Sequence, residues 1–498
     1  MTISMDNYTN VLTCDNIVNK VILKEIKMAI RELKIKGLRS FEKEVTINFA
    51  MPNGSDVGSG LNVLVGGNNS GKSTIIEALH LLSYRGEIMT LPNNMLNDKN
   101  HGQLKIEVNY KNNEDKLVNL KFETSEETGT MPKINGKFIG NDYEHERMKN
   151  VMILSSKRSI SSTFSNLRSE ERNEYESNVF DLDYRTQYFA NSSFGGRLIK
   201  IINDRETFNS ILKRVIDPIP NWSLGSDDFN KATLTFRFGD HIHNSTGAGD
   251  GYINLFNIVD ALYDSKNGDT IVIDEPEVSL HPELLRRLFS LLVEYSKDRQ
   301  IIIATHSPYF VDWKLFSENS KVMRVSKENY YSHIYELSND GKGALRKFLN
   351  DQGNIHTISL DTNEVFFLGD NIIVTEGQED VIGYKKIFAD RGFYPNASFF
   401  GWGAGGALKI EQVLKILADL GYSKVFAIYD GDMKDVAEKV EKKYPNYKIY
   451  TIRASDIRNK DVNSSVEKIK ELINKSDSIS EESKKHLLEI IDNNFKIK

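Results

Sequence analysis

Apolar and polar residues follow two different patterns along this chain. Three short, mostly apolar runs, Leu61–Val65, Thr270–Ile273 and Ile301–Ala304, have the composition of parallel strands that are buried on both faces. Stretches between about 30 and 49 and between 104 and 139 alternate apolar and polar residues instead, which is typical of antiparallel strands with one exposed face. The pattern therefore predicts an α/β fold with a parallel core sheet and a subdomain of antiparallel strands.

Polar and irregular stretches indicate how the chain divides. Residues 1–28 form an N-terminal extension to which we assign no chemistry. Residues 29–350 are predicted to form the first domain, which contains a helical insertion at about 157–235 where apolar residues are few. Residues 366–498 are predicted to form a smaller α/β domain with a parallel sheet and C-terminal helices. The 498 residues suffice for two or three separate cores.

Composition restricts the compartment and the kinds of partner. The single cysteine, Cys14, excludes an intramolecular disulfide and any cysteine-based zinc site. No apolar run approaches the ~20 residues of a membrane span, and Met1–Asn10 lacks the apolar core of a signal peptide. We therefore expect a cytoplasmic protein with no membrane partner. The formal net charge of -6 argues against wrapping nucleic acid by overall charge, yet it permits a local basic groove or a metal-mediated phosphate contact.

The first apolar run leads into a glycine-rich loop, and apolar residues at helical spacing follow that loop. The spacing of Gly66, four further residues, and then Gly71-Lys72-Ser73 meets the P-loop pattern. Its glycines let successive backbone N–H groups point at phosphate oxygens, its lysine contacts the β- and γ-phosphates, and its serine oxygen binds Mg²⁺. The strand–loop–helix context disfavours a turn that binds nothing. The predicted nucleotide contacts are Gly66, Asn68, Asn69, Ser70, Gly71, Lys72, Ser73 and Thr74.

Two further strand ends extend the predicted nucleotide site. The second apolar run ends in Asp274 and Glu275, which would place Asp274 beside the Mg²⁺ of the P-loop serine and let Glu275 orient the attacking water. The third run ends in His306, a candidate sensor of the γ-phosphate. Considered alone, each of these motifs could also be a buried strand that ends in solvated polar residues and binds no nucleotide. Arg39 and Phe41 either flank the nucleotide base or are a surface arginine and a core aromatic.

Together these motifs resemble those of the ATP-binding-cassette (ABC) ATPases, in particular their SMC-like and OLD (overcoming lysogenization defect) branch. The resemblance implies an ABC-type head that dimerises on ATP, with a signature loop from a second protomer closing over the nucleotide. The matching stretch departs from the usual Leu-Ser-Gly-Gly form but keeps Ser245 and Gly247 as nucleotide contacts. The resemblance rests on Gly66–Thr74, Asp274–Pro282 and Thr305–Pro308, with Asn244–Gly251 as the signature stretch.

A second set of acidic strand ends lies in the last third of the chain. One apolar strand leads to Glu376 and Asp380, and a later strand ends in Asp430 and Asp432. Because the carboxyl ends of neighbouring parallel strands lie at one edge of a sheet, we expect the four acids to converge. Carboxylate oxygens suit Mg²⁺ or Mn²⁺, and two such ions can promote phosphodiester cleavage. The alternative for any one acid is a solvated strand end.

This second unit resembles a TOPRIM domain, the metal-binding module shared by topoisomerases, primases and OLD nucleases. Glu376 matches the leading glutamate of that module, and Asp430 and Asp432 match its Asp-x-Asp. The extra acid of OLD nucleases is matched by Asp380, with Glu379 as a rival. The resemblance therefore implies that these acids hold the metal ions and act in catalysis.

The segments around the TOPRIM-like acids carry further candidates. Gly401–Gly406 lies where the module has a glycine-bearing turn. The resemblance suggests Asp456 as a ligand of a second metal and Lys460 as a catalytic phosphate contact. The tail is locally basic, which fits either a DNA backbone groove or a solvated, lysine-rich helix. Its basic residues include Lys434, Lys439, Lys442, Lys443, Arg453 and Arg458.

An ABC-type head followed by a TOPRIM unit is the architecture of the OLD family, and that resemblance implies an ATP-regulated, divalent-metal-dependent DNA endonuclease. The expected partners are DNA, a second copy bound through the head, and a partner from a defence system. Family members often act against phage, some in Gabija-like systems beside a partner protein or in retrons beside a reverse transcriptase with its non-coding RNA and DNA. By analogy we expect an effector of anti-phage defence.

Other functions remain as alternatives. The chain could be a non-cleaving, ATP-dependent switch or scaffold that senses DNA or a partner. A topoisomerase would need a nucleophilic tyrosine on a separate DNA-breakage domain, for which no segment is available. A repair ATPase with a long coiled-coil arm is disfavoured, because the interval from Ser73 to Asp274 is short and sustains no heptad repeat.

Overall fold

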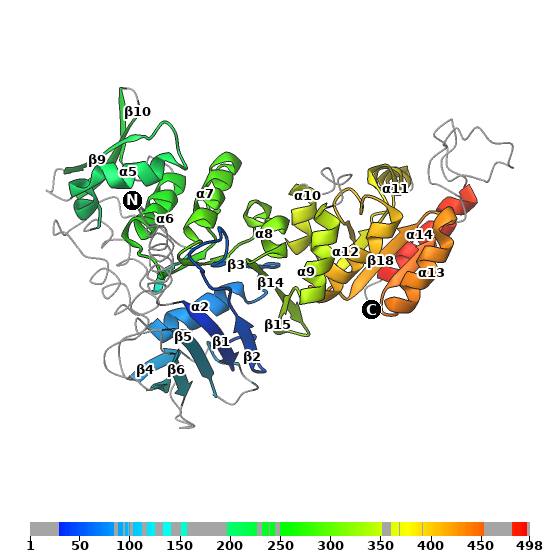
Figure 1. The fold of residues 1–498 in the computed structure, drawn as a ribbon, viewed down its shortest axis with the longest axis horizontal. Helices are drawn as coiled ribbons and strands as arrows, with labels where there is room; N and C mark the ends of the chain where they lie inside the picture. Colours follow the sequence, from blue (N-terminus) through cyan, green and yellow to red (C-terminus); the bar gives the residue numbers. More distant parts are fainter. Residues whose placement is uncertain are drawn as a thin grey trace, which may run out of the picture.

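The architecture comes from a computed structural model of the 498-residue chain (Figure 1). The N-terminal extension 1–28 and residues 157–196 of the expected insertion lie outside the described part. The structure describes residues 29–83, 88–92, 95–97, 99, 103–111, 117–124, 133–140, 151–156, 197–226, 232–238, 240–244, 250–350, 360–367, 369–390, 392–452 and 481–495.

A six-stranded sheet forms the centre of the first part of the chain. In spatial order its strands are β15 (Tyr331–Glu336), β14 (Lys321–Glu328), β3 (Leu61–Val65), β13 (Gln300–Ala304), β12 (Thr270–Asp274) and β8 (Val151–Leu154). The strands from β14 to β8 are parallel, and β15 runs antiparallel to β14. The three apolar runs of the sequence are therefore confirmed as neighbouring parallel strands, which is the core sheet expected for this fold class.

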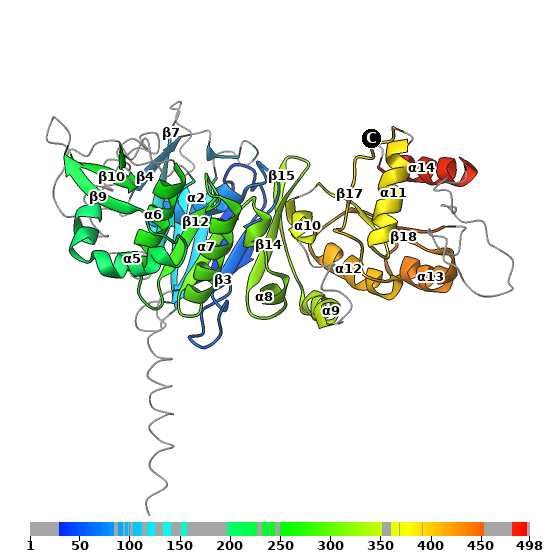
Figure 2. The same cartoon turned by 90° about the horizontal axis from the view of Figure 1, so that it is seen from above.

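Helices cover both faces of this central sheet. They are α2 (Lys72–Ser83) on one face and α6 (Asp250–Asp264) with α7 (Pro282–Tyr295) on the other (Figure 2). Alternate residues of the strands point to opposite faces, as pleated backbone requires. Leu64 and Ile302 pack in the cluster that contains α2, whereas Val63 and Ile303 pack with α6 and α7. Burial on both faces explains why these strands are mostly apolar.

An antiparallel sheet covers the outer side of α2. In spatial order it contains β2 (Val45–Asn48), β1 (Ile30–Lys36), β5 (Lys105–Lys111), β6 (Leu117–Thr124), β7 (Lys133–Gly140) and β4 (Ile88–Pro92). Leu33 and Ile35 of β1 are buried against α2, and Lys34 between them faces outward. The alternating stretches of the sequence are thus confirmed as antiparallel strands with one exposed face.

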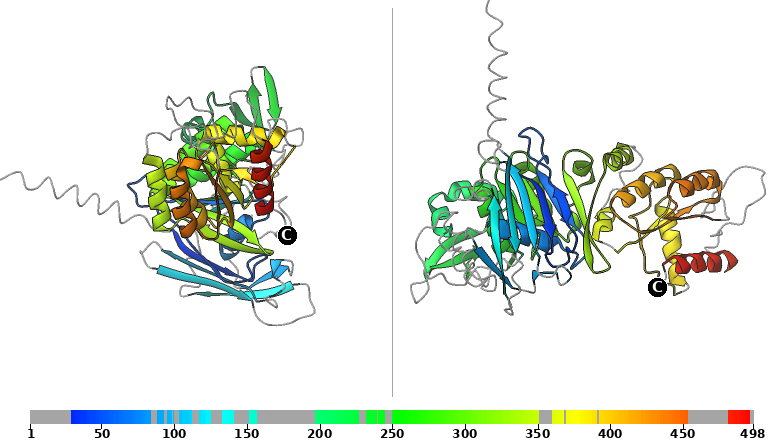
Figure 3. Two further views of the ribbon diagram at one scale, coloured as in Figure 1. Left: turned by 90° about the vertical axis from the view of Figure 1, so that its right-hand side faces the viewer. Right: turned by 90° about the horizontal axis from the view of Figure 1, so that it is seen from below.

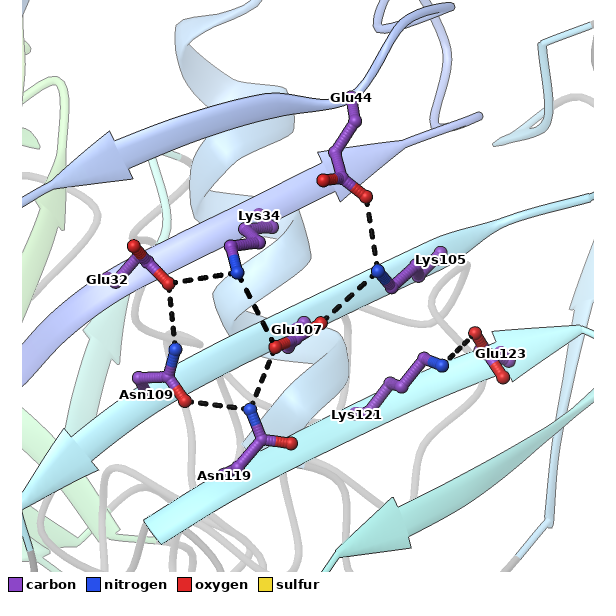
Figure 4. Close-up of polar contacts among 9 residues, drawn as sticks. All are labelled: Glu32, Lys34, Glu44, Lys105, Glu107, Asn109, Asn119, Lys121 and Glu123. Carbon is purple, nitrogen blue, oxygen red and sulfur yellow. Dashed lines mark hydrogen bonds and ion pairs between the residues drawn. The ribbon is translucent and has the colours of Figure 1, made fainter. Parts of the chain in front are cut away.

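The exposed face of this sheet carries a network of opposite charges (Figure 4). The ammonium group of Lys34 lies 3.7 Å from Glu107, that of Lys105 lies 3.3 Å from Glu107, and Lys121 pairs with Glu123. Burial acts to raise the pKa of Glu107, but hydrogen bonds from Asn119 and Lys105 hold it below its usual value. Exposed pairs of this kind add little stability. The lysines drawn in Figure 4 are paired with glutamates, so they do not form a basic groove.

A small sheet and a helix follow the undescribed part of the expected insertion. They are α5 (Arg205–Lys213), β9 (Asn221–Ser226), β10 (Ala232–Phe238) and β11 (His241–Asn244), and β10 is the central strand. The expectation of helix up to about 235 is wrong for β9 and the start of β10. Trp222 and Phe236 are buried there, each with its ring 5.4 Å from that of Phe256 on α6. This tertiary contact overrides the weak local pattern.

A four-stranded parallel sheet forms the last part of the chain. Its strands in spatial order are β17 (Ser398–Phe399), β16 (Asn371–Val374), β18 (Lys424–Tyr429) and β19 (Lys448–Thr451). Its helices are α11 (Gln378–Asp390), α12 (Ala407–Asp419), α13 (Lys434–Lys443) and α14 (Glu481–Phe495). The expected parallel pairing of 371–374 with 424–429 is confirmed. No helix among the described residues combines the length and apolarity that a membrane crossing takes.

This sheet lies beyond β14 and β15 along the longest axis of the molecule (Figure 3), and hydrophobic packing continues across the junction. The indole of Trp313 lies 4.9 Å from the ring of Phe366, and Phe348 lies 6.3 Å from Phe400. The chain therefore passes from one unit to the next without a break in its core. The connecting elements are η3 (Pro308–Phe310), α8 (Trp313–Ser317), α9 (Asn339–Asn350), α10 (Leu360–Asn363) and η4 (Glu364–Phe367).

One buried glutamine joins the central sheet to the antiparallel sheet. The side-chain oxygen of Gln300 accepts a hydrogen bond from the Ile30 N–H at 2.8 Å, and its nitrogen donates to the Ile30 and Ala50 carbonyls at 2.8 and 3.0 Å. The hydroxyl of Thr270 donates to the same side-chain oxygen at 3.0 Å. Gln300 is fully buried, so loss of its amide would leave backbone groups without partners away from water.

We expect Gln300→Leu to lower the free energy of unfolding by about 3 kcal/mol, because it removes the partners of several buried groups. The measurement is urea-induced unfolding followed by circular dichroism. Gln412→Leu on α12 is the matched control, since the side-chain oxygen of Gln412 is buried and has no hydrogen-bond partner among the described residues. It should change stability by less than about 1 kcal/mol. Equal losses in the two variants would contradict the assigned role of Gln300.

Candidate functional site

The loop between β3 and α2 has the backbone conformation that a phosphate-binding loop needs. Gly66 has a φ of 141°, and Gly71 has a φ of 115°. A Cβ atom at Gly66 would lie 2.1 Å from the carbonyl oxygen of Val325, and one at Gly71 would lie 2.6 Å from the hydroxyl oxygen of Ser332. Glycine is therefore required at both positions by conformation and by the close approach of the strands beside them.

Lys72 lies in the first turn of α2 and is buried beneath this loop. Its ammonium group donates hydrogen bonds to the carbonyl oxygens of Gly66 at 2.9 Å and Gly67 at 3.0 Å. Burial lowers the pKa of Lys72 to about 8, although the negative charges of Asp274 and Glu275 oppose that shift. The loop thus holds a cation whose charged form gains stability when an anion such as a phosphate approaches.

The structure brings the two predicted oxygen ligands of the nucleotide's Mg²⁺ together. Ser73 follows Lys72 on α2, and Asp274 ends β12, so their side chains come from elements far apart in sequence. The Ser73 hydroxyl lies 3.5 Å from an Asp274 carboxylate oxygen. A hydroxyl and a carboxylate suit a hard cation, so this pair fits Mg²⁺.

Glu275 and His306 lie side by side at the ends of β12 and β13. The Nε2 atom of His306 is 3.9 Å from a carboxylate oxygen of Glu275. Burial, followed by the positive charge of Lys72, lowers the pKa of His306, whereas Glu275 acts in the opposite direction. The histidine is therefore mainly neutral near pH 7, and a neutral imidazole can accept or donate a hydrogen bond beside the acid.

Glu277 belongs to this site, although sequence analysis assigned it no role. Its carboxylate accepts hydrogen bonds from the backbone N–H of His306 at 2.5 Å and from the Thr305 hydroxyl at 2.9 Å. Burial raises its pKa, and these hydrogen bonds act to lower it. Glu277 thereby fixes the backbone that carries His306. Its place in the acidic run after β12 is the only local signal for that role.

Arg39 and Phe41, the candidates for flanking the nucleotide base, contact the protein itself. Phe41 is fully buried and lies against Gly71, which agrees with the core-aromatic alternative. The guanidinium group of Arg39 forms an ion pair with Glu77 of α2 at 2.7 Å. This pair ties the turn after β1 to the helix that follows the P-loop.

The signature residues Ser245 and Gly247 lie outside the described residues, so their contacts stay a prediction. The helix that follows them, α6, is held against the loop after β12. The side-chain nitrogen of Asn254 donates to the carbonyl oxygens of Pro276 at 3.0 Å and Val278 at 2.8 Å. A Cβ atom at Gly251 would lie 2.3 Å from the carbonyl oxygen of Ser279. The sequence alone did not indicate this connection.

The two acids expected to meet in the C-terminal sheet do so. Glu376 follows β16, Asp430 follows β18, and these strands are parallel neighbours. A carboxylate oxygen of Glu376 accepts a hydrogen bond from the backbone N–H of Asp430 at 2.9 Å. Asp380, in the first turn of α11, accepts one from the Gly377 N–H at 2.7 Å. The observed contacts therefore bring the two strand ends together at one edge of the sheet.

The pKa of one buried phenol in the C-terminal unit is affected by three of the predicted acids. Tyr384 on α11 is buried, and burial raises its pKa well above the usual value. The negative charges of Asp380, Asp430 and Glu376 raise it further. Asp380 and Asp430 are themselves buried, at 5% and 8% exposure. Burial disfavours the ionised form of these two aspartates, so a bound cation would stabilise their charged form.

Other predicted nuclease residues lie further out. Asp432, in the short helix η5 (Gly431–Met433), is exposed, and so is Glu379. Of the two rivals, Asp380 is thus the buried one beside Glu376. Asp456 and Lys460 lie outside the described residues and stay predictions.

The predicted glycine turn packs directly against the residue that follows Glu376. A Cβ atom at Gly403 would lie 2.8 Å from the Cα atom of Gly377. The backbone N–H of Gly406 donates to the Glu376 carbonyl oxygen at 2.7 Å, and that of Ala404 donates to the Thr375 carbonyl oxygen at 2.8 Å. The turn therefore fixes the backbone of Glu376 from the side opposite to Asp430.

The fit of a divalent metal to these acids rests on the chemistry of the donors. Within the described residues, no group of three or more histidine, cysteine, aspartate or glutamate side chains already has the arrangement of a metal site. Glu376, Asp380 and Asp430 nevertheless supply only hard carboxylate oxygens, which are the preferred donors of Mg²⁺ and Mn²⁺. The donor set fits such ions and does not fit zinc-type sulfur or imidazole coordination.

A cavity of about 440 Å³ lies beside the edge strand β17. Five of its twelve lining residues are aromatic, and Phe393, Tyr394 and Trp402 are among them. The ammonium group of Lys385 lies 4.9 Å from the centre of the Trp402 ring. Trp402 belongs to the same glycine turn, 401–406, whose backbone bonds to Glu376.

Comparison with known proteins places the first half of the chain in a family. Residues 61–312, just over half of the chain, match the family described as "AAA domain, putative AbiEii toxin, Type IV TA system". The chain belongs to this AAA domain family. The matched range contains the P-loop, the acid pair and His306, so this AAA domain holds the whole described nucleotide site.

The AAA chain is also similar to an OLD nuclease from Thermus scotoductus, with 29% identity over 177 residues. That alignment covers 34% of this chain and 32% of the relative, so the chain matches about a third of that protein's length. The predicted resemblance to the OLD family is confirmed by this relationship. It leaves the TOPRIM assignment untested.

Solved structures of SMC head domains resemble the AAA chain as well. An Smc head bound to the C-winged helix domain of ScpA shows 17% identity and a TM-score of 0.43, covering 62% of this chain and 98% of that one. An Smc head with an extended coiled coil, bound to the C-terminal domain of ScpA from Pyrococcus furiosus, shows 16% identity and a TM-score of 0.42, covering 65% and 100%.

The lowered pKa of Lys72 predicts that ATP binding takes up a proton at alkaline pH. Below pH 8 the ammonium group is already charged, whereas above pH 8 the phosphates must raise its pKa and recharge it. We expect uptake of about 0.8 proton per ATP at pH 8.5 and about 0.2 at pH 7.5, with affinity falling as pH rises through 8. Calorimetric titration in buffers of different ionisation enthalpy measures this uptake.

Lys72→Arg is the control for that measurement, because its guanidinium group stays charged at both pH values. Its ATP binding should show no such uptake. Equal proton uptake in the parent at pH 7.5 and 8.5 would contradict the lowered pKa.

Proposed function

We propose that this AAA protein is an ATP-regulated, divalent-metal-dependent DNA endonuclease. The observation that carries the proposal is the meeting of Glu376 and Asp430 at the ends of neighbouring parallel strands, with a 2.9 Å hydrogen bond between them. Asp380, which is also buried, accepts a hydrogen bond from the N–H of Gly377, the residue after Glu376. Asp380 and Asp430 are carboxylates removed from water, and burial of a carboxylate is costly to stability, which is why such groups indicate a functional site.

The nuclease residues of this proposal are Glu376, Asp380, Asp430 and Asp432, with Asp456 as a ligand on the undescribed segment. Bound divalent ions would supply an activated water and neutralise charge on the cleaved phosphate. The chain's own part is positioning. The Asp430 N–H orients the Glu376 carboxylate, and the Gly377 N–H orients that of Asp380. Lys460 would contact the phosphate backbone.

In the nucleotide site, Lys72 would exchange its two loop carbonyls for the β- and γ-phosphate oxygens of ATP. Ser73 and Asp274 would hold the Mg²⁺ that accompanies the nucleotide. Glu275 would orient the attacking water, and His306 beside it would contact the γ-phosphate. Glu277 keeps His306 in place through the 2.5 Å bond to its backbone.

Two descriptions of similar proteins support a nuclease with a defence role. The relative from Thermus scotoductus is named a nuclease, and the description of the AAA family names a toxin. We propose that two copies associate through their heads on ATP, with Ser245 and Gly247 completing the partner's site. The protein would act in the cytoplasm as an effector of anti-phage defence, beside a partner protein or a retron's reverse transcriptase.

Asp430→Asn should lower cleavage of supercoiled plasmid by at least about 100-fold with either Mg²⁺ or Mn²⁺. Asparagine keeps the size of the side chain and the backbone N–H that orients Glu376, but it removes a negative charge needed to hold the cation. ATP hydrolysis should stay within twofold of the parent. The measurement is the rate of nicked and linear product formation on agarose gels.

Asp435→Asn is the matched control, because Asp435 is exposed on α13 close by in sequence. It should cleave like the parent. Cleavage by Asp430→Asn at the parental rate would overturn the metal-site assignment. A parent that hydrolyses ATP and dimerises but cuts no plasmid with either metal would favour a switch or scaffold whose C-terminal unit docks a partner.

Glu275→Gln should slow ATP hydrolysis by about 100-fold or more, because the amide cannot accept a proton from the attacking water. ATP binding should persist, so an ATP-bound dimer should accumulate. Sedimentation velocity with and without ATP measures that association. Glu283→Gln is the control, since Glu283 lies exposed on α7 in an ion pair with Arg287. A Glu275→Gln protein that binds ATP and stays monomeric would contradict ATP-driven pairing of heads.

A further inference from the structure

The hairpin formed by β14 and β15 touches the P-loop at two points. Strand β14 pairs with β3 so that Arg324 lies opposite Val65, the residue before the loop. The next carbonyl, that of Val325, lies against Gly66, where a Cβ atom would come within 2.1 Å. On β15, the Ser332 hydroxyl donates to the Ser70 carbonyl oxygen at 2.5 Å. A movement of the P-loop backbone would therefore displace the hairpin directly.

The same hairpin contacts the C-terminal unit on its other side. Arg324 is 4% exposed, and its guanidinium group donates to the Leu420 carbonyl oxygen at 3.1 Å and forms an ion pair with Asp370. It also lies over the ring of Tyr422, at 3.9 Å from the ring centre. One buried side chain thus makes three different contacts across the junction.

A second contact on the hairpin supports the first. A Cβ atom at Gly421 would lie 2.5 Å from the ring of Tyr335 on β15, so the backbone of the C-terminal unit packs closely on this tyrosine. The side chains of Arg324 and Tyr335 lie opposite each other across β14 and β15. The hairpin therefore presents a continuous surface to residues 420–422.

The hairpin contacts residues that lie shortly before the two strands that lead to the nuclease acids. Asp370 directly precedes β16, which leads to Glu376. Leu420 and Tyr422 lie in the turn before β18 (Lys424–Tyr429), which leads to Asp430. A strand is extended, with a rise of ~3.3 Å per residue, and its hydrogen bonds join it to its neighbours. A displacement at the beginning of such a short strand therefore reaches its end. The hairpin is thus connected to both acids by one strand each.

We propose that Arg324 is a positioning residue that couples nucleotide occupancy of the P-loop to the alignment of Glu376 with Asp430. This coupling rests on the proposed nuclease function and specifies how ATP regulates it. When phosphates take the Lys72 ammonium group from the Gly66 and Gly67 carbonyls, the loop changes at its contact with Val325. The hairpin passes that change through Arg324 to the starts of β16 and β18.

The test compares Arg324→Gln with the parent in two measurements. The first is the ratio of plasmid cleavage rates with and without ATP. The second is hydrogen–deuterium exchange of residues 370–376 and 424–430 with and without ATP. We expect the ATP dissociation constant to stay within twofold, the ratio of cleavage rates to fall to about 1, and the ATP-induced change in exchange to disappear.

Arg299→Gln is the matched control. Arg299 also lies over a tyrosine ring, that of Tyr295 at 4.7 Å, and bonds to the Ser265 carbonyl oxygen at 3.0 Å and to Asp298. All of these contacts lie within the AAA domain. This variant should keep the parental response to ATP even where it lowers thermal stability. If Arg324→Gln fails to fold, Asp370→Asn is the second variant. It removes the charge that pairs with Arg324, while Arg324 keeps its bond to Leu420. It should weaken the response of the cleavage rate to ATP.

The outcomes separate this proposal from the nuclease assignment. If Arg324→Gln keeps the parental ratio of cleavage rates, Arg324 does not couple the sites. If the parent cuts no DNA, the nuclease function fails, and hydrogen–deuterium exchange still decides the coupling. Unchanged exchange of both strands on ATP binding by the parent would overturn the proposal.

Discussion

The parallel strands β3, β13 and β12 are buried on both faces, and this burial determines where polar groups can emerge. Inside these strands the side chains are mostly apolar, and the buried polar ones, Asn62, Thr270 and Gln300, are hydrogen-bonded, so charged residues appear where a strand ends. The P-loop, Asp274 and His306 each follow such an end. Because the strands are parallel, these ends share one edge, and groups from distant parts of the sequence meet there.

The C-terminal unit applies the same constraint on a smaller scale. Strands β16 and β18 are buried neighbours, and the first acids after them meet through the hydrogen bond between Asp430 and Glu376. In the nucleotide site Lys72 supplies a positive charge near Asp274 and Glu275, whereas in the C-terminal unit the backbone N–H groups of Asp430 and Gly377 orient the carboxylates of Glu376 and Asp380.

Local sequence patterns predicted the elements and edges, because strand burial and loop chemistry depend on neighbouring residues. They did not predict Glu277, Asn254, Gln300 or Arg324, whose roles arise from partners far away in the chain. Gln300, for example, forms hydrogen bonds with the backbone of Ile30. The sequence around either residue does not predict this contact. The strands β9 and β10 were missed for the same reason, since Trp222 and Phe236 are buried by a helix elsewhere.

The aromatic packing at the junction bears on how such a protein can change over evolution. Trp313, Phe348, Phe366 and Phe400 form one apolar surface that belongs to neither unit alone. A gene cut between residues 350 and 366 would leave large apolar side chains facing water on both products. Exchange of the C-terminal unit for an unrelated one would therefore require simultaneous changes in the head. The two units are expected to diverge together, as one inherited piece.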